Sequence, residues 1–264
     1  MWTKPEGPSI VILKELVEKF KGKKIIVAKG NAKVDKDRLT NKNIIAFKSW
    51  GKQFFICLPR LSIRIHFLLF GSYSIDEQTK PDRSLRLAIS TNKGTMYFYT
   101  CSVRLIEDSL DDLYDWETDV MSDNWNENKA KKALKLVPNT MVCDALLNQE
   151  IFSGVGNIIK NEVLYRIRVH PDSLIGNIPQ KKINELIREA RNYSFDFLEW
   201  KKAFVLKKHW LAHTKKICQR CKLPLIKKYC GKTNRRTFFC ENCQVKYKPG
   251  SENLSKRKPR QMPG

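Results

Sequence analysis

Apolar and polar positions follow two different spacings along the chain, and the change falls near residue 110. Over residues 10–20 apolar side chains recur every three or four positions and Gly22 follows, which predicts a helix. Over residues 24–107, short runs rich in β-branched and aromatic residues alternate with glycine-containing turns. This second pattern predicts an antiparallel sandwich or barrel.

Beyond residue 110 the spacing of apolar residues becomes helical. We predict helices over residues 111–137, 144–149, 157–168, 180–200 and 202–210. The predicted fold class is therefore α+β, with an N-terminal antiparallel β-sandwich and flanking helices, then a helical domain that carries a β-hairpin. The predicted units are residues 1–120, 121–212, 213–249 and a flexible basic tail, 250–264.

Charge is unevenly distributed, and it indicates the class of partner. The chain of 264 residues has a formal net charge of +23. Residues 201–264 alone hold 19 lysines and arginines against two acids, a net charge of +17. A basic surface favours nucleic acid, because neutralising phosphates releases counterions. A solvated basic tail is the alternative, and an anionic membrane is less favoured because no basic amphipathic helix is evident.

Eight cysteines and the absence of a signal-peptide pattern predict an intracellular, reducing location, in cytoplasm or nucleoid, or in the nucleus of a eukaryote. No apolar run of about 18 residues is present, so no membrane span is expected. Nothing in the sequence requires a partner chain, so a monomer is expected.

Four cysteines have the spacing of a metal site. Two Cys-x-x-Cys pairs stand 18 residues apart, and each pair can form one knuckle of a tetrahedral Zn²⁺ site. With all four positions filled, one such zinc per chain would be structural. The predicted ligands are Cys218, Cys221, Cys240 and Cys243. Cys230 has no evident role, whereas Cys57, Cys101 and Cys143 are predicted to be core residues.

A glycine-containing turn precedes the helix predicted at residues 157–168. Gly154 and Gly156 permit a tight turn and the close approach of a ligand, and Asn157 is predicted to cap the helix. The first N–H groups of that helix would then face an anion such as a DNA phosphate. An ordinary helix cap is the alternative interpretation.

Several motifs together resemble the Fpg/Nei family of DNA glycosylases (formamidopyrimidine-DNA glycosylase and endonuclease VIII-like). Residues 147–171 resemble its helix–two-turn–helix, and three further motifs follow in suitable order. They are Pro5-Glu6-Gly7-Pro8, Gly51-Lys52, and Arg235-Arg236-Thr237-Phe238-Phe239-Cys240 at the end of the zinc hairpin.

The resemblance implies excision of a damaged base that is flipped out of double-stranded DNA, followed by cleavage at the abasic site. Its implied catalytic residues are Pro5, the amine nucleophile; Glu6, the acid; and Lys52, a phosphate contact near the lesion. Its implied DNA contacts are Asn157, Arg235 and its neighbour Arg236, with Leu69 filling the space left by the flipped base. Taken without the family motifs, Lys52 is an ordinary turn lysine and Leu69 is a core leucine. Arg235 is then a general phosphate contact.

Two residues depart from the family pattern. Pro5 is fifth, so its nitrogen is an amide unless translation starts nearer Pro5 or a protease removes residues 1–4. Ser9 stands where most members carry a second glutamate. Three alternatives therefore stay open: a lesion-binding protein without the lyase step, a monofunctional glycosylase that uses Glu6 and water, and a zinc-ribbon protein unrelated to repair.

Substrate choice is implied only by the opening motif. Pro-Glu-Gly-Pro is more similar to the Nei branch, which prefers oxidised pyrimidines, than to the 8-oxoguanine branch. The loop that recognises the lesion is expected near residues 172–201.

Overall fold

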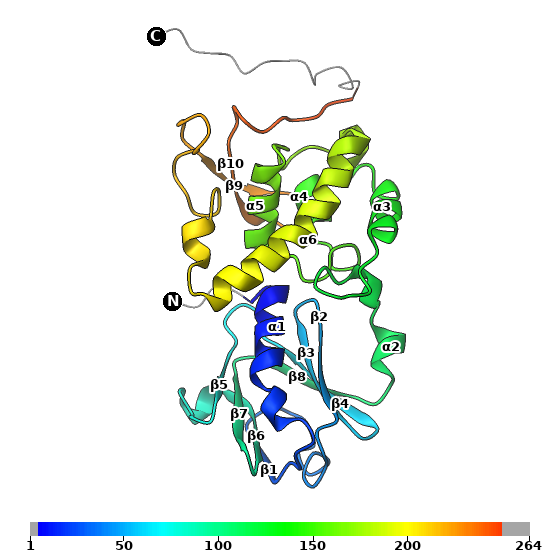
Figure 1. Cartoon of the computed structure of the whole chain (residues 1–264), viewed down its shortest axis with the longest axis vertical. Helices are drawn as coiled ribbons and strands as arrows, with labels where there is room; N and C mark the ends of the chain where they lie inside the picture. The colour runs from blue at the N-terminus through cyan, green and yellow to red at the C-terminus, as the bar shows by residue number, and fades with distance from the viewer. Residues whose placement is uncertain (1–4, 250–264) are drawn as a thin grey trace.

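The computed structural model describes residues 5–249. Figure 1 shows two domains stacked along the long axis, with strands β1–β8 in one and helices α3–α6 with strands β9 and β10 in the other. The predicted flexible tail, 250–264, and residues 1–4 lie outside the described residues. No helix among residues 5–249 is long and apolar enough to cross a membrane.

The N-terminal domain is an antiparallel β-sandwich, as predicted. The first sheet has the order β1-β6-β7-β5, with the bounds Val27–Lys29, Leu85–Thr91, Gly94–Tyr99 and Ser72–Ile75. The second has the order β2-β3-β4-β8, with the bounds Ala46–Trp50, Gln53–Leu58, Leu61–His66 and Ser102–Ile106. Every pairing between neighbouring strands is antiparallel.

Alternation along the strands places one apolar face of each sheet in the core. On β4, Leu61, Ile63 and Ile65 are buried while the residues between them are half-buried. Helix α1 (Gly7–Leu16), followed by the short turn η1 (Glu18–Phe20), adds Ile10 and Leu13 to the same core. The full burial of one such side chain stabilises the fold by about 1.5–3 kcal/mol.

The C-terminal domain packs short helices around one long helix. The helices are α3 (Glu127–Lys135), α4 (Val142–Ala145), α5 (Asn157–Arg166) and α6 (Gln180–Lys202), whereas α2 (Leu110–Leu113) lies beside the sandwich (Figure 1). The 3₁₀ turns η3 (Trp116–Thr118) and η4 (Ile175–Asn177) precede α3 and α6, and η5 (Leu206–His209) follows α6. The hairpin strands β9 (Ile226–Cys230) and β10 (Arg235–Phe239) pack beside α5, so the predicted α+β fold class is confirmed.

The prediction of one helix over residues 111–137 is wrong. The chain there forms α2, η3 and α3, which are separate short elements. Asp115 and Asn126 each accept a hydrogen bond from a backbone N–H two or three residues ahead. Such short polar side chains compete with continuous helix and start new turns.

Two other helices were predicted too long. Helix α4 ends at Ala145 rather than 149, and the Asn148 side chain accepts the Glu150 N–H in the turn that follows. Over residues 202–210 only η5 forms, because Phe204 has a φ of 59°, which lies in the left-handed region and ends the helical path.

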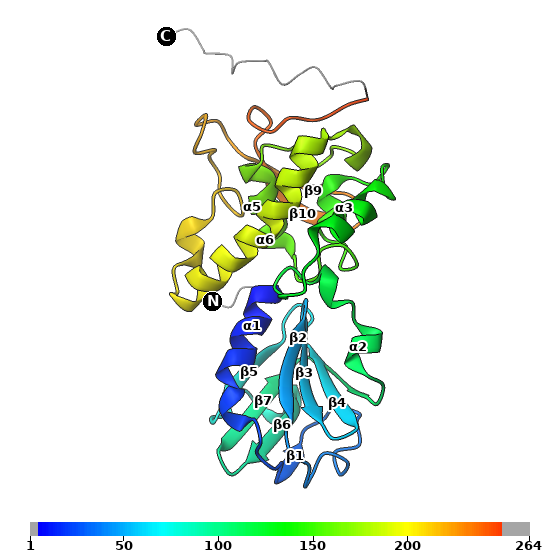
Figure 2. The ribbon, with the colours of Figure 1, turned by 45° about the vertical axis from the view of Figure 1, so that its right-hand side comes forward.

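The two domains meet where backbone segments approach each other closely. The Gly7 N–H donates to the Gly154 carbonyl at 2.9 Å, and a Cβ on Gly7 would lie only 2.9 Å from the Gly154 Cα. The Asp119 carboxylate accepts the Gly51 N–H at 2.9 Å, which ties the β2–β3 turn to the second domain. The start of α1 lies beneath α6 at this junction (Figures 1 and 2).

Candidate active site and DNA-contact surface

A cavity of about 1000 Å³ opens at the junction of the two domains. Both domains contribute to its walls, and every residue that the sequence predicted for catalysis or DNA contact borders it. These residues are Pro5, Glu6, Lys52, Leu69, Asn157, Arg235 and Arg236. Residues as far apart in the chain as Pro5 and Arg236 therefore converge on one site.

Glu6 is the one acidic residue among those that border this cavity. It precedes the first residue of α1, and only 2% of its surface is exposed. Its Oε1 accepts the Ile158 N–H at 2.7 Å, and its Oε2 accepts the Ile159 N–H at 3.2 Å. These amides form the first turn of α5, where the helix dipole favours negative charge.

This geometry corrects the prediction for the turn before α5. The anion at the helix N-terminus is the Glu6 carboxylate, not a DNA phosphate, and the N-cap residue is Gly156, not Asn157. A Cβ on Gly156 would lie 2.6 Å from the Glu6 Cδ, so only glycine leaves room for the carboxylate. The close approach predicted from the two glycines is therefore an approach between protein segments.

Lys52 lies on the other side of the carboxylate, in the turn between β2 and β3. Its Nζ donates to the Val155 carbonyl at 2.7 Å. Burial lowers the pKa of Lys52 to about 8, although the negative charge of Glu6 opposes the shift. Lys52 is thus a cation at neutral pH that bridges the sandwich and the turn before α5.

The protonation of Glu6 is a balance of burial against positive charge. Burial raises its pKa above the ordinary value. The charge of Lys52, the two N–H donors of α5 and the charge of Lys201 all act in the opposite direction. A carboxyl group placed in this way can change protonation closer to neutral pH than an exposed glutamate can.

Asn157 and the two arginines lie together at the cavity wall. The Asn157 Nδ2 donates to the Arg236 carbonyl at 2.9 Å, which joins the start of α5 to β10. The Asn157 Oδ1 is buried without a hydrogen-bond partner. Arg235 is half-buried and Arg236 is exposed, so a mixed group of donors borders the cavity at the hairpin.

Leu69 is not a core residue, so that alternative is excluded. It lies in the turn after β4 with 47% of its surface exposed, between Leu68 and Phe70, which are more exposed still. Leu68 and Leu69 border the cavity. An exposed apolar turn beside a cationic cavity is suited to entering a base stack.

The four predicted zinc ligands form a compact group at the hairpin. Their sulfur atoms all lie within 4.8 Å of one another. The Sγ atoms of Cys218 and Cys243 are 3.9 Å apart, and those of Cys221 and Cys240 are 3.5 Å apart. Tetrahedral zinc with Zn–S bonds of about 2.3 Å places its sulfurs about 3.8 Å apart, so the four residues fit that ion.

The remaining cysteines lie apart from this group. Cys101 and Cys143 are buried in the two cores, as predicted, whereas Cys57 is only half-buried and belongs to neither. Cys230 is buried at the end of β9 beside Thr237.

The prediction of a lesion-recognition loop near residues 172–201 is wrong. Residues 180–202 form helix α6, and no residue of 172–201 borders the cavity. The cavity is instead bordered by the segment after α6, through Lys207, Trp210, His213 and Thr214. The Glu162 carboxylate holds this segment by accepting the N–H groups of residues 211–213.

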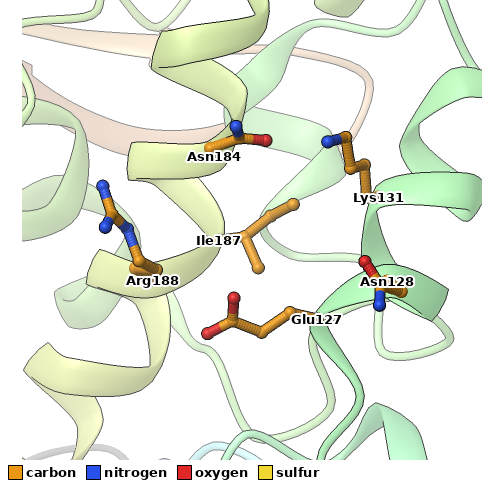
Figure 3. A pocket seen from close by; sticks show the side chains of 6 residues that line it. All are labelled: Glu127, Asn128, Lys131, Asn184, Ile187 and Arg188. Atoms are coloured by element: carbon orange, nitrogen blue, oxygen red, sulfur yellow. The ribbon is translucent and has the colours of Figure 1, made fainter.

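A smaller cavity of about 300 Å³ lies between α3 and α6, with the Ile187 side chain between the two helices (Figure 3). Glu127, Lys131 and Arg188 surround it with both signs of charge. It shares no residue with the cavity at the domain junction.

Sequence reasoning missed Lys201, a charged group that acts on Glu6. Lys201 lies near the end of α6, and its Nζ donates to the Ser9 Oγ at 2.6 Å. The two residues are 192 positions apart, and a lysine in the last turn of a helix is an ordinary feature. No local pattern could have indicated this contact.

Comparison with known proteins agrees with this arrangement. Residues 117–199 match the family model described as the formamidopyrimidine-DNA glycosylase H2TH domain. The chain is 30% identical over 243 residues to endonuclease 8-like 3 of Xenopus laevis, an alignment that covers 88% of this chain. The chain belongs to the Fpg/Nei family.

Other endonuclease 8-like proteins are similar to this chain in sequence. The human endonuclease 8-like 3 is 30% identical over 74% of this chain, and the mouse endonuclease 8-like 2 is 27% identical over 76%. The chain spans 39% of the length of the Xenopus relative and 33% of the human one. These proteins are therefore much longer than the chain described here.

Solved structures of DNA glycosylases share the fold. A viral DNA glycosylase superposes with a TM-score of 0.79 at 21% identity and covers 91% of this chain and all of its own. Lactococcus lactis formamidopyrimidine-DNA glycosylase, bound noncovalently to DNA with an abasic site, superposes with a TM-score of 0.80 at 20% identity. That alignment covers 90% of this chain and 99% of the other.

Proposed function

We propose that the protein is a base-excision-repair DNA glycosylase with an associated abasic-site lyase activity, and that it favours oxidised pyrimidines. The observation that carries the proposal is the Glu6 carboxylate, which borders the cavity and is held by the first turn of α5. Lys52 and the donors of the hairpin surround the same cavity. A flipped nucleotide would place its sugar there and its phosphates against the cations.

In this proposal the Pro5 nitrogen is the nucleophile. A neutral secondary amine attacks the sugar C1′, the bond from C1′ to the base breaks, and ring opening gives an iminium ion. Glu6 supplies a proton to the sugar ring oxygen or the leaving base, and takes one up again during the later elimination. Elimination then breaks the bond to the 3′ phosphate. The attack requires a free Pro5 amine, because an amide nitrogen has no available lone pair.

The DNA contacts follow the predicted roles. Lys52 would bind a phosphate next to the lesion, and Asn157 with Arg235 and Arg236 would hold the backbone on both sides of it. Leu69 would enter the space left by the flipped base. The position of all these residues around one cavity supports these separate DNA-binding roles.

Zinc is proposed as a structural ion, one per chain. Cys218, Cys221, Cys240 and Cys243 would hold it, and it would fix the hairpin that presents Arg235. Four thiolates leave no open position for water, so the ion would serve folding rather than catalysis.

Borohydride trapping on duplex DNA with an abasic site tests the covalent step. Two forms of the protein are compared: one that begins at Pro5 and one that keeps residues 1–4. We expect a covalent adduct only with the form that begins at Pro5, and none after acetylation of its terminal amine. A demonstrated free Pro5 that gives no adduct would exclude the lyase step.

Incubation of the same two forms with a duplex that contains an oxidised base distinguishes the two alternatives that the family membership leaves open. Release of an oxidised base without an adduct would indicate a monofunctional glycosylase that uses Glu6 and water. Binding without release would indicate a lesion-binding protein.

The preference for oxidised pyrimidines rests on similarity to the Nei branch, and the relatives named endonuclease 8-like support it. Rates of base release from duplexes that contain thymine glycol, 5-hydroxycytosine or 8-oxoguanine test it. Faster release of 8-oxoguanine than of both pyrimidines would contradict it.

A further inference from the structure

The end of helix α6 delivers a second lysine to the surroundings of Glu6. Lys201 is half-buried, and its Nζ donates to the Ser9 Oγ at 2.6 Å. Ser9 is itself buried in the first turn of α1, three residues after Glu6. The contact therefore links α1, which begins directly after Glu6, to α6 of the other domain.

Lys201 and Glu6 act on each other through their charges. Burial lowers the pKa of Lys201 to about 8, and the negative charge of Glu6 opposes that shift. In turn, the positive charge of Lys201 opposes the effect of burial on the pKa of Glu6. Lys201 remains mainly protonated at neutral pH, so the interaction is between opposite charges.

The other groups that face Glu6 come from three elements. Lys52 comes from the β2–β3 turn, the Ile158 and Ile159 N–H groups from α5, and the neutral Tyr193 hydroxyl from α6. Lys52 and Lys201 are the two lysines among them, and only Lys52 borders the cavity.

The different positions of Lys52 and Lys201 relative to the cavity matter once DNA is bound. A phosphate beside Lys52 would offset the effect of that lysine on Glu6, because the two charges have opposite signs. Lys201 is not among the residues that border the cavity, so DNA there would leave its charge in place. We propose that Lys201, held by Ser9, is a positioning residue that stabilises the carboxylate formed when Glu6 gives its proton, while DNA occupies the cavity.

The inference rests on the proposed glycosylase function, and a pH profile tests it. The form that begins at Pro5 is used, and single-turnover release of thymine glycol is measured across the pH range. In Lys201→Met the limb of the profile that reports Glu6 should move to higher pH by about one unit, because the carboxyl group loses a nearby cation. Lys201→Arg keeps the charge and should retain the wild-type limb.

Lys202→Met is the matched control. Lys202 is the next residue of α6, but it pairs at the surface with Glu15 of α1, so its substitution should leave the profile unchanged. Ser9→Glu offers Lys201 a carboxylate partner and should shift the limb in the same direction as Lys201→Met. Thermal unfolding of each variant separates a change in protonation from a loss of fold.

A second measurement reads Glu6 without turnover. The ¹³C resonance of its carboxyl group is titrated in the protein bound to a duplex with a tetrahydrofuran abasic analogue. Lys201→Met should raise the midpoint, and Lys201→Arg should restore it. An unchanged midpoint in Lys201→Met, or no restoration by arginine, would overturn the inference. A raised midpoint in a protein that releases no base would refute the proposed function alone.

Discussion

At the scale of single residues, Glu6 combines near-complete burial with several sources of positive potential. A buried carboxylate without partners would take up a proton or destabilise the fold. Here two backbone N–H groups and two lysines oppose that tendency, and none of them is a neighbour of Glu6 in sequence. The group can therefore be shielded from water and still give or take a proton.

Lys52 should make DNA binding depend on pH. The lysine is charged below its pKa of about 8 in the free protein and becomes neutral above it. A phosphate binds only the charged form, so affinity for a duplex with a tetrahydrofuran abasic analogue should fall by about tenfold as the pH rises through that value. Fluorescence anisotropy at constant salt measures the change.

Lys52→Arg provides the comparison for this pH dependence. Arginine keeps its charge throughout the range, so the fall in affinity should largely disappear. An equal fall in the wild type and the variant would show that another group is responsible.

At the scale of elements, the N-terminal turn of α5 binds the Glu6 carboxylate of the same protein. The sequence correctly indicated a tight turn, a helix and an anion at its N-terminus. It could not indicate which anion, since a phosphate and a distant glutamate satisfy the same backbone donors. Only the fold shows that Glu6 fills the position.

Gly156→Ala should separate the position of Glu6 from the stability of the fold. The added Cβ would lie 2.6 Å from the Glu6 Cδ and must displace the carboxylate from the α5 amides. Base release should slow by about 10² or more, which is the usual loss when a general acid is misplaced. Single-turnover kinetics measure the rate, and anisotropy should show DNA binding within about threefold of the wild type. A normal rate in the folded variant would mean that the contact is not needed for the reaction.

Other elements differ in how far the sequence defines them. Strand alternation and the two Cys-x-x-Cys pairs are local patterns with fixed geometric meaning, and the sandwich and the cysteine group follow them. Helix ends were predicted less well, because side chains such as Asp115 and Asn126 start new turns inside a helical pattern. Contacts such as Lys201 with Ser9 depend on how two domains pack, and no local pattern carries that information.

At the scale of the whole molecule, the positive charge of residues 201–264 contributes most of the net charge of +23. The described part of this segment includes the hairpin arginines at the cavity. A protein that binds DNA mainly through such charges loses affinity steeply with salt.

Arg235→Ala should weaken binding to every lesion to the same extent. In the proposed function Arg235 contacts phosphate rather than a base, so the slope of log K against log salt should become shallower by about one. Salt titrations with several lesion duplexes measure this. A loss confined to one lesion would instead indicate that Arg235 reads the base.

Removal of zinc should disable DNA binding before it disrupts the sandwich. The cysteine group holds the hairpin with Arg235 and Arg236, whereas the core of the sandwich lies in the other domain. A strong chelator should release about one zinc per chain and weaken binding at least about tenfold. Metal analysis and anisotropy follow both events, and Cys101→Ser, which alters a cysteine outside the group, is the control. Full affinity without metal would contradict a role for zinc in this surface.

The residues that hold Glu6 are made late during synthesis. A ribosome completes the sandwich before it reaches Ile158 and Ile159, so a nascent chain carries the acid without the amides that orient it. The same is true of any proteolytic fragment cut between the two domains. Under the proposed function, base excision would therefore require that the second domain has also folded.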